Sequence, residues 1–308
     1  LSGTGSVANA NVASNKTVTL GTLALADNSG LAANYTLSGG THQLTVDQRP
    51  LNATLARQYD GTTASAGSTL SSFDALQGGE TLTLSGSGTS ASANVANGIA
   101  MSSNGNLALV DGTGLASNYS LNSTVINITP RVLNSSGSKI YDANTDALAA
   151  DITLSNLVSG ETLNHSGTAT ISPANTGNYT LNNLPGITLA DNTGTASNYT
   201  LTGGTHIFTV NPKVVSIQGN KTYDGNTTIS SGDITSITDT VGAETLVISS
   251  GSGTVSSANA ATYASADINE GTLTLGNGTN GGLASNYTLT GHAASSFQVA
   301  QRVLSSSG

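Results

Sequence analysis

The sequence predicts an all-β protein, a tandem array of ~82-residue antiparallel β-sandwich-like (Ig-like) domains joined end to end. The first observation is a Tyr-Asp motif that recurs every 82 residues, with its tyrosines at Tyr59, Tyr141 and Tyr223. The second is an alternation of apolar and polar residues, as in Thr-Leu-Thr-Leu at residues 81–84, which is typical of a strand with one buried face. The third is a glycine-containing turn signal roughly every ten residues, which indicates antiparallel strands.

The domain boundaries follow from aligning the repeats with one another. The predicted units are the C-terminal part of a truncated repeat (1–50), three complete repeats (51–131, 132–213 and 214–301) and the start of a next repeat (302–308). At each junction an apolar strand pattern meets a basic residue, often beside a proline, which cannot continue a strand ladder. We therefore expect separate domains with very short linkers.

A parallel β-helix is the main alternative architecture for a repetitive β-rich chain. Solenoid repeats usually have ~20–45 residues and lack punctuated junctions. The 82-residue period, with proline and a basic residue at the junctions, favours separate sandwich-like domains.

Composition limits the ways in which these domains interact. Only 8% of residues are charged, the net charge is −9 and there is no cysteine. Each domain must therefore be held by its core and strand ladders, without disulfides or thiolate metal sites. The negative charge argues against nucleic acid as a partner. No apolar run approaches the ~20 residues that span a bilayer, so we expect no direct membrane insertion.

Recurring polar residues form the candidate structural motif. They are Tyr59, Asp60 and Glu80 in the first repeat, Tyr141, Asp142 and Glu161 in the second, and Tyr223, Asp224 and Glu244 in the third. A basic residue precedes each tyrosine by two positions (Arg57, Lys139 and Lys221) and is expected on the same strand face. We expect mostly buried tyrosines, with each glutamate paired to the basic residue of its repeat. A catalytic carboxylate pair is the alternative, but no nucleophile or further base accompanies it, so no enzymatic activity is expected.

Single aspartates in glycine-containing turns raise the question of calcium. These are Asp27, Asp111 and Asp191, and the third repeat has Asn277 in their place. Calcium takes six to eight oxygen ligands, whereas each turn offers one carboxylate. We therefore expect these residues to cap their turns and expect no cofactor, with Ca²⁺ as the remaining alternative.

The histidines are expected on exposed strands. His42, His206 and His292 follow glycine-rich turns, but the first complete repeat has Ser123-Thr124 where a histidine would fall. Without a second ligand in each copy, a metal site is not predicted.

The motifs resemble a known family. The Lys-x-Tyr-Asp-Gly start, the Gly-Glu-Thr-Leu middle, the Ala-Ser-Asn-Tyr-Thr-Leu segment and the closing Val-Asn-Pro-Lys are similar to the YDG-type repeats, with their MBG-type relatives, of large secreted haemagglutinin-like bacterial adhesins. The likeness covers essentially the whole chain. Ala143 replaces the motif glycine in the second repeat. Because left-handed backbone favours glycine, this substitution predicts that the position need not be left-handed.

The resemblance implies an extracellular location or the outer surface of Gram-negative bacteria, and a structural stalk in an adhesin or biofilm-matrix protein. The expected partners are neighbouring repeats of the same chain, with other copies of the protein or cell-surface and matrix glycans as further candidates. The alternative function is a repeated weak carbohydrate- or protein-binding module that acts by avidity. The sequence has no tryptophan and only three phenylalanines. Because binding surfaces are enriched in aromatic residues, this composition favours the stalk.

Overall fold

The computed structural model describes residues 1–305, so the end of the predicted next repeat, 306–308, lies outside the described residues. Within 1–305 the chain is all-β: it has no α-helix, and none of its helical segments could span a bilayer. The fold class predicted from the sequence is therefore confirmed. The short 3-10 turns are η1 (Ala32–Asn34), η2 (Gly67–Thr69), η3 (Ala116–Asn118), η4 (Ala149–Asp151), η5 (Ala196–Asn198), η6 (Ser231–Asp233), η7 (Ser265–Asp267) and η8 (Ala284–Asn286).

The strands are short and follow the predicted alternation. Up to the end of the first repeat they are β1 (Ala13–Thr17), β2 (Gln43–Val46), β3 (Arg49–Gln58), β4 (Ala64–Ala66), β5 (Leu70–Phe73), β6 (Leu82–Ser85), β7 (Ser87–Ser90), β8 (Ala96–Ser103), β9 (Ala108–Asp111) and β10 (Tyr119–Thr129). The second repeat has β11 (Arg131–Val132), β12 (Asn134–Ile140), β13 (Asp146–Leu148), β14 (Ile152–Ser155), β15 (Asn164–Thr170), β16 (Gly177–Thr180), β17 (Ile187–Ala190), β18 (Tyr199–Thr200) and β19 (His206–Asn211). The third has β20 (Lys213–Val214), β21 (Ser216–Thr222), β22 (Thr228–Ser230), β23 (Ile234–Thr238), β24 (Leu246–Ser250), β25 (Ser252–Val255), β26 (Ala261–Ala264), β27 (Ile268–Asn269), β28 (Thr274–Asn277), β29 (Tyr287–Thr288) and β30 (Ser296–Ala300).

The chain divides into two compact units. The first comprises Leu1–Arg131 together with Ser197–Tyr199, and the second comprises Val132–Ala196 and the residues from Thr200 onward. The first unit contains the six-stranded sheet β4-β7-β8-β10-β3-β5 and the pairs β1-β2 and β6-β9. The second contains two four-stranded sheets, β14-β12-β19-β16 and β23-β21-β30-β26, each accompanied by a three-stranded sheet, β13-β15-β17 or β22-β25-β27.

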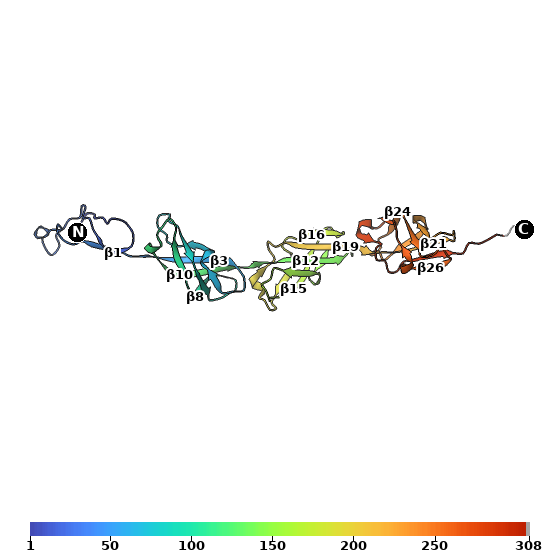
Figure 1. Cartoon of the computed structure of the whole chain (residues 1–308), viewed down its shortest axis with the longest axis horizontal. Coiled ribbons are helices and arrows are strands. Elements are labelled where there is room, and N and C mark those ends of the chain that lie inside the picture. The colour runs from blue at the N-terminus through green and yellow to red at the C-terminus, as the bar shows by residue number, and fades with distance from the viewer. Residues whose placement is uncertain (306–308) are drawn as a thin grey trace. The chain divides into compact units, whose positions relative to one another are not determined.

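Most strand pairs are antiparallel, but the first and last long strands of each repeat lie side by side and run parallel. The pairs are β3 with β10, β12 with β19 and β21 with β30, and Figure 1 shows the first two. The sequence prediction did not anticipate this pairing, because apolar alternation has the same period in parallel and antiparallel strands. The chain therefore enters and leaves each repeat along neighbouring strands.

Facing residues of this parallel pair compensate for each other in size, so that where one strand has a small residue the other has a large one. In the first repeat Leu55 faces Ile126, whereas Gly137 faces Phe208 in the second. The Phe208 ring fills the space over the glycine, since a Cβ added to Gly137 would lie 2.8 Å from the ring. The core thus keeps its packing while its residues differ, as close-packed interiors require.

Residues 1–50 form a much less buried segment. The structure describes all of them and none is buried. Their regular structure consists of the pair β1-β2, η1, two isolated bridges (Ser2 with Ala24 and Ser6 with Thr19) and the first two residues of β3. An apolar groove of about 520 Å³, lined by residues such as Leu20, Leu23 and Leu44, lies on this segment.

Candidate functional site at the repeat junctions

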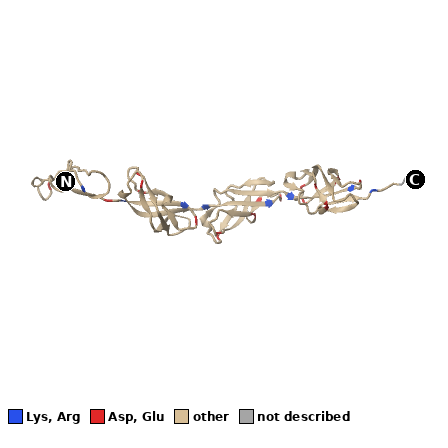
Figure 2. Ribbon diagram, viewed as in Figure 1, with Lys and Arg blue, Asp and Glu red and all other residues tan. Residues whose placement is uncertain are grey.

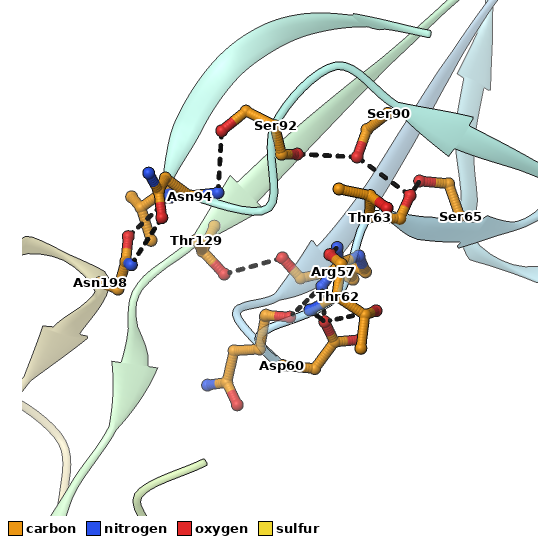
Figure 3. Close-up of polar contacts among 12 residues, drawn as sticks. Arg57, Asp60, Thr62, Thr63, Ser65, Ser90, Ser92, Asn94, Thr129 and Asn198 are labelled. Atoms are coloured by element: carbon orange, nitrogen blue, oxygen red, sulfur yellow. Dashed lines mark hydrogen bonds and ion pairs between the residues drawn. The ribbon is translucent and has the colours of Figure 1, made fainter. Parts of the chain in front are cut away.

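Each Tyr-Asp motif forms a closed polar turn. In the first repeat the Arg57 guanidinium donates to the Asp60 carboxylate and to the Thr62 carbonyl, while the Thr62 N–H donates to Asp60 Oδ1 at 2.9 Å. Figure 3 shows these groups facing one another. Charged residues occupy few positions along the ribbon as a whole (Figure 2). The motif therefore combines a basic residue with an aspartate that caps its own turn.

The other two copies repeat this geometry. Lys139 Nζ donates to Asp142 Oδ1 at 2.8 Å, and Lys221 Nζ donates to Asp224 Oδ1 at 3.1 Å. Burial alone would raise the pKa of Asp142, but hydrogen bonds from Lys139 and Asn144 outweigh it and hold that pKa below 3.8. The prediction that each basic residue pairs with the glutamate was wrong, because an aspartate three residues away is nearer along the chain and already fixed in the turn.

The residue after each aspartate is left-handed in all three copies. Its φ is +78° at Gly61, +62° at Ala143 and +83° at Gly225. The prediction that Ala143 relaxes this requirement was wrong. The alanine is accommodated because the position is open, as a Cβ at Gly225 would meet no atom within 4 Å. Its cost is thus one of backbone conformation rather than of collision.

In the second unit the motif tyrosine reaches the following repeat. Tyr141 donates from its hydroxyl to Glu244 Oε1 at 2.8 Å, and Tyr287 donates to Glu244 Oε2 at 2.7 Å. The two rings meet edge to face, with centroids 5.4 Å apart. One carboxylate therefore holds two phenols from successive repeats, and charge-assisted bonds of this kind are among the stronger ones.

Both phenols are held in the neutral form. Burial, followed by the bond to Glu244, raises the pKa of Tyr141 to about 12, and the same two causes raise the pKa of Tyr287. The backbone N–H of Val241 donates to the Tyr287 oxygen at 3.0 Å. Each hydroxyl can then donate to the glutamate at any pH below the range in which it ionises.

A second contact at this junction joins two asparagines. Asn286 Oδ1 accepts the Thr176 N–H and Asn286 Nδ2 donates to Asn175 Oδ1, both at 3.0 Å. Thr176 also donates from its hydroxyl to the Ser285 carbonyl at 2.8 Å. Asn286 is fully buried. A buried amide with its oxygen and nitrogen both paired is specific to one relative placement of the two loops.

The first unit contains the same asparagine contact twice. Asn118 Oδ1 accepts the Val12 N–H and Asn198 Oδ1 accepts the Val95 N–H, both at 2.9 Å. Their amide nitrogens donate to asparagines in the facing loops, Asn11 and Asn94, and Figure 3 shows the latter pair. The tyrosine contact also recurs, with Tyr59 edge to face against Tyr199 at 5.4 Å.

Residues 1–50 carry no Tyr-Asp copy, and their junction with the first repeat differs accordingly. Tyr119 donates to Glu80 within its own repeat, and this bond raises its pKa. Beside them lies a cavity of about 200 Å³ that Arg49 and Asn118 also line. In the second unit Tyr141 bridges the junction, and residues 1–50 offer no equivalent tyrosine.

The terminal copies of both motifs are exposed. Tyr223 is 41% exposed and Tyr35 is 70% exposed, whereas Tyr141 and Tyr287 are 4% and 5% exposed. The prediction that Tyr223 is mostly buried was wrong, because burial of this tyrosine is supplied by the following repeat. The recurring residues are therefore the residues that join one repeat to the next.

Comparison with known proteins agrees with this arrangement. The family model described as YDG domain matches residues 40–126, 127–206 and 209–295. The chain belongs to the YDG domain family. No curated protein and no solved structure matches it. The matched stretches begin and end at other residues than the predicted repeats 51–131, 132–213 and 214–301, and those boundaries stay a prediction.

The three motif glutamates of the YDG repeats occupy equivalent turns. The backbone N–H of each donates to the carbonyl three residues earlier: Glu80 to Gln77, Glu161 to Val158 and Glu244 to Val241. A glycine lies against the side chain in the first two repeats, since a Cβ at Gly114 or Gly194 would lie 2.6 Å from the glutamate oxygen. This contact explains the glycine of the neighbouring Asp-x-x-Gly turn.

The aspartates considered for calcium bind backbone. Asp27, Asp111 and Asp191 each accept, through Oδ1, the N–H of the alanine five residues later, at 2.6–2.7 Å. Asn277 accepts the Ala284 N–H at 2.8 Å in the third repeat. Among the described residues no three His, Cys, Asp or Glu side chains gather as they would around a metal ion. Calcium binding stays an untested alternative.

Histidine 206 departs from the expected exposed position. It is fully buried, with Nδ1 3.0 Å from Ser135 Oγ and Nε2 2.8 Å from the Leu201 carbonyl. His42 makes the corresponding contact with the Leu37 carbonyl at 2.6 Å. These histidines brace the loop before the last strand of a repeat, which is why they follow glycine-rich turns.

Sequence reasoning missed the loop asparagines that face the Asn-Tyr motif. Asn11, Asn94 and Asn175 make these contacts, and each follows an alanine, at intervals of 83 and 81 residues. In a chain rich in asparagine an Ala-Asn pair is inconspicuous, and only its spacing, close to that of the Tyr-Asp motif, could have revealed it.

Proposed function

We propose that these YDG repeats are a structural spacer, the stalk segment of a secreted or surface-attached bacterial adhesin or biofilm-matrix protein. The observation that carries the proposal is that the recurring residues make contacts between successive repeats. In the second unit Tyr141, Glu244 and Asn286 connect one repeat to the next. A ligand-binding residue would need to be accessible in every copy, whereas a junction residue is buried wherever another repeat lies beside it.

The junction in the second unit has the features of a stiff connection. Only Pro212 separates β19 from β20, whereas flexible linkers are longer and rich in glycine and serine. The proline restricts the backbone, and the Tyr141–Glu244–Tyr287 and Asn175–Asn286 contacts fix the two sides against each other. A stiff connection makes the reach of an array grow with the number of repeats.

Composition supports placement outside the cell. The chain is poor in lysine and has a sequence pI of about 4.5, a composition that favours an extracellular surface. Without cysteine, the stability of its domains does not depend on the redox state of the compartment. A spacer must also lack reactive or strongly adhesive groups of its own. The sequence, with no tryptophan and a single methionine, has few such groups.

Small-angle scattering on the whole chain and on a variant lacking residues 132–213 tests the spacer. The deletion joins Arg131 to Val214, which recreates the native order of a basic residue followed by valine. We expect the maximum dimension to fall by roughly 30 Å, the length of a ten-residue strand, with the remaining repeats folded. Asn286→Ala keeps the chain length and loosens one junction, so it should broaden the distance distribution. Identical profiles for Asn286→Ala and the parent would contradict a stiff junction.

The alternative function is a binding module that acts by avidity, and a second experiment distinguishes it from the spacer. Whole cells carrying arrays of different length should adhere according to reach, while the binding specificity of the distal head stays unchanged. A glycan array probed with residues 132–301 should give no reproducible signal. A signal that strengthens with repeat number would overturn the spacer and identify the repeats as the recognition element.

A further inference from the structure

We propose that each repeat is also a load-bearing clamp, in which the parallel pair of first and last strands carries tension in shear. A spacer needs only length, so bearing tension is a separate property of the fold. The biological use of the clamp rests on the proposed function, whereas the clamp itself does not. The inference comes from the strand topology together with the burial of the paired strands.

The direction of the two strands decides how a pull is distributed. In the second repeat the chain enters at the start of β12 and leaves at the end of β19, and these strands pair in parallel from Ser135 opposite His206 to Ile140 opposite Asn211. The entry and exit points therefore lie at opposite ends of the pair. Pulling them apart slides the strands lengthwise, so that all the bonds between them are loaded together. If entry and exit lay at the same end, the bonds would open one at a time.

The same arrangement occurs in each complete repeat. The register pairs ten residues of β10 with β3, six of β12 with β19 and five of β21 with β30. A further bond closes each ladder at its exit end, from the backbone N–H of the motif tyrosine to the last strand: Tyr59 to Thr129 at 2.9 Å, Tyr141 to Asn211 at 2.9 Å and Tyr223 to Ala300 at 2.8 Å. The motif thus links the end of the clamp to the junction.

The clamp strands are flanked on both sides by other strands and bury one face, whereas residues such as Ile140 and Ile207 on the other face are exposed. Each lies inside its sheet with a second neighbour, as in the orders β14-β12-β19-β16 and β23-β21-β30-β26. Phe208 of β19 and Phe297 of β30 are almost fully buried on that inner face. On this face and between the flanking strands, water has little access to replace a ladder bond as it stretches. Forced unfolding is governed by the unfolding barrier, and simultaneous loading of shielded bonds raises that barrier.

Single-molecule pulling in two directions tests the clamp. The chain has no cysteine, so one introduced cysteine is a unique handle. Thr222 is exposed at the end of β21 and lies opposite Ala300. In Thr222→Cys, tension between this cysteine and the C-terminus peels β30 from one end, whereas tension between the two chain termini shears the pair.

We expect end-to-end pulling to open the three repeats in separate steps, each lengthening the chain by roughly 250 Å, the extended length of about 80 residues less the folded length. The third repeat should open at a several-fold lower force when peeled, with a similar gain in length. Thr222→Cys pulled end to end is the control and should match the parent. Equal opening forces in the two directions would overturn the clamp. A flexible array in scattering would overturn the spacer alone, so the two failures are distinguishable.

Discussion

The Tyr-Asp motifs at Tyr141 and Tyr223 have the same turn and different surroundings. In both, a lysine two residues earlier binds the aspartate, and the N–H two residues after the aspartate donates to its carboxylate at 3.1 Å. Yet Tyr141 is 4% exposed and Tyr223 is 41% exposed. Because the turns match, the difference arises from the following repeat, which supplies Glu244 and Tyr287 to Tyr141 alone. The turn is therefore formed by residues of the motif itself, whereas the tyrosine is buried only by contact with the following repeat.

The largest effect should come from removing the tyrosine at the occupied junction. Tyr141→Ala should cost about 3 kcal/mol or more, the range for losing a buried aromatic side chain, and Tyr223→Ala should stay within about 0.5 kcal/mol, as for exposed positions. Urea unfolding of the whole chain, followed by hydrogen exchange at the Thr176 and Val241 amides, measures both. Equal costs for the two substitutions would show that the tyrosine stabilises its own repeat and not the junction.

Alkaline pH should weaken the occupied junction next. The pKa of Tyr141 is raised to about 12 in the folded chain, above the ~10 of an unfolded tyrosine. Its contribution is therefore complete below pH ~10 and is lost as the pH rises from there through ~12. Glu244→Gln replaces a charged acceptor by a neutral one and should cost about 1–2 kcal/mol below that range.

Melting temperatures measured from pH ~9 to ~12 report the loss of stability that accompanies tyrosine ionisation. Glu244→Gln should make the alkaline decline smaller without abolishing it, since the charged acceptor is removed while burial, the larger cause of the raised pKa, remains. Tyr223→Phe is the matched control and should leave the profile unchanged. A parent protein with no decline across this range would contradict the two-phenol junction.

The features that the sequence predicted are those encoded over a few residues. The period-two alternation specified strands, and aspartates in glycine-containing turns specified capped turns. Glu244 was assigned to a basic residue because opposite charges attract, but its partners Tyr141 and Tyr287 lie 103 and 43 residues away. No local pattern carries that information. Likewise, alternation cannot distinguish the parallel pair β12-β19 from an antiparallel one.

A smaller effect should come from backbone conformation within the two turns. Ala143 has a φ of +62° and Gly225 one of +83°. The left-handed region costs an alanine about 1–2 kcal/mol, partly offset by the extra chain entropy that glycine loses on folding. Ala143→Gly should therefore stabilise its repeat by up to about 1 kcal/mol, and Gly225→Ala should destabilise its repeat by a similar amount. Urea midpoints of the two variants measure this, and shifts of the same sign would contradict a shared left-handed turn.

The smallest effect should come from the charge of the turn aspartates. Asp191 Oδ1 accepts the Ala196 N–H at 2.7 Å, and Asn277 does the same for Ala284 at 2.8 Å in the next repeat. Because a neutral amide serves equally there, the turn requires an acceptor oxygen and not a carboxylate. Asp191→Asn should change stability by less than about 0.5 kcal/mol, whereas Asp191→Ala loses the cap and should cost about 1 kcal/mol. Melting temperatures with calcium and with a chelator should coincide for all three proteins. A calcium-dependent rise in the parent that Asp191→Asn abolishes would instead identify the aspartate as a metal ligand, since a site with six to eight oxygen ligands depends on its carboxylates.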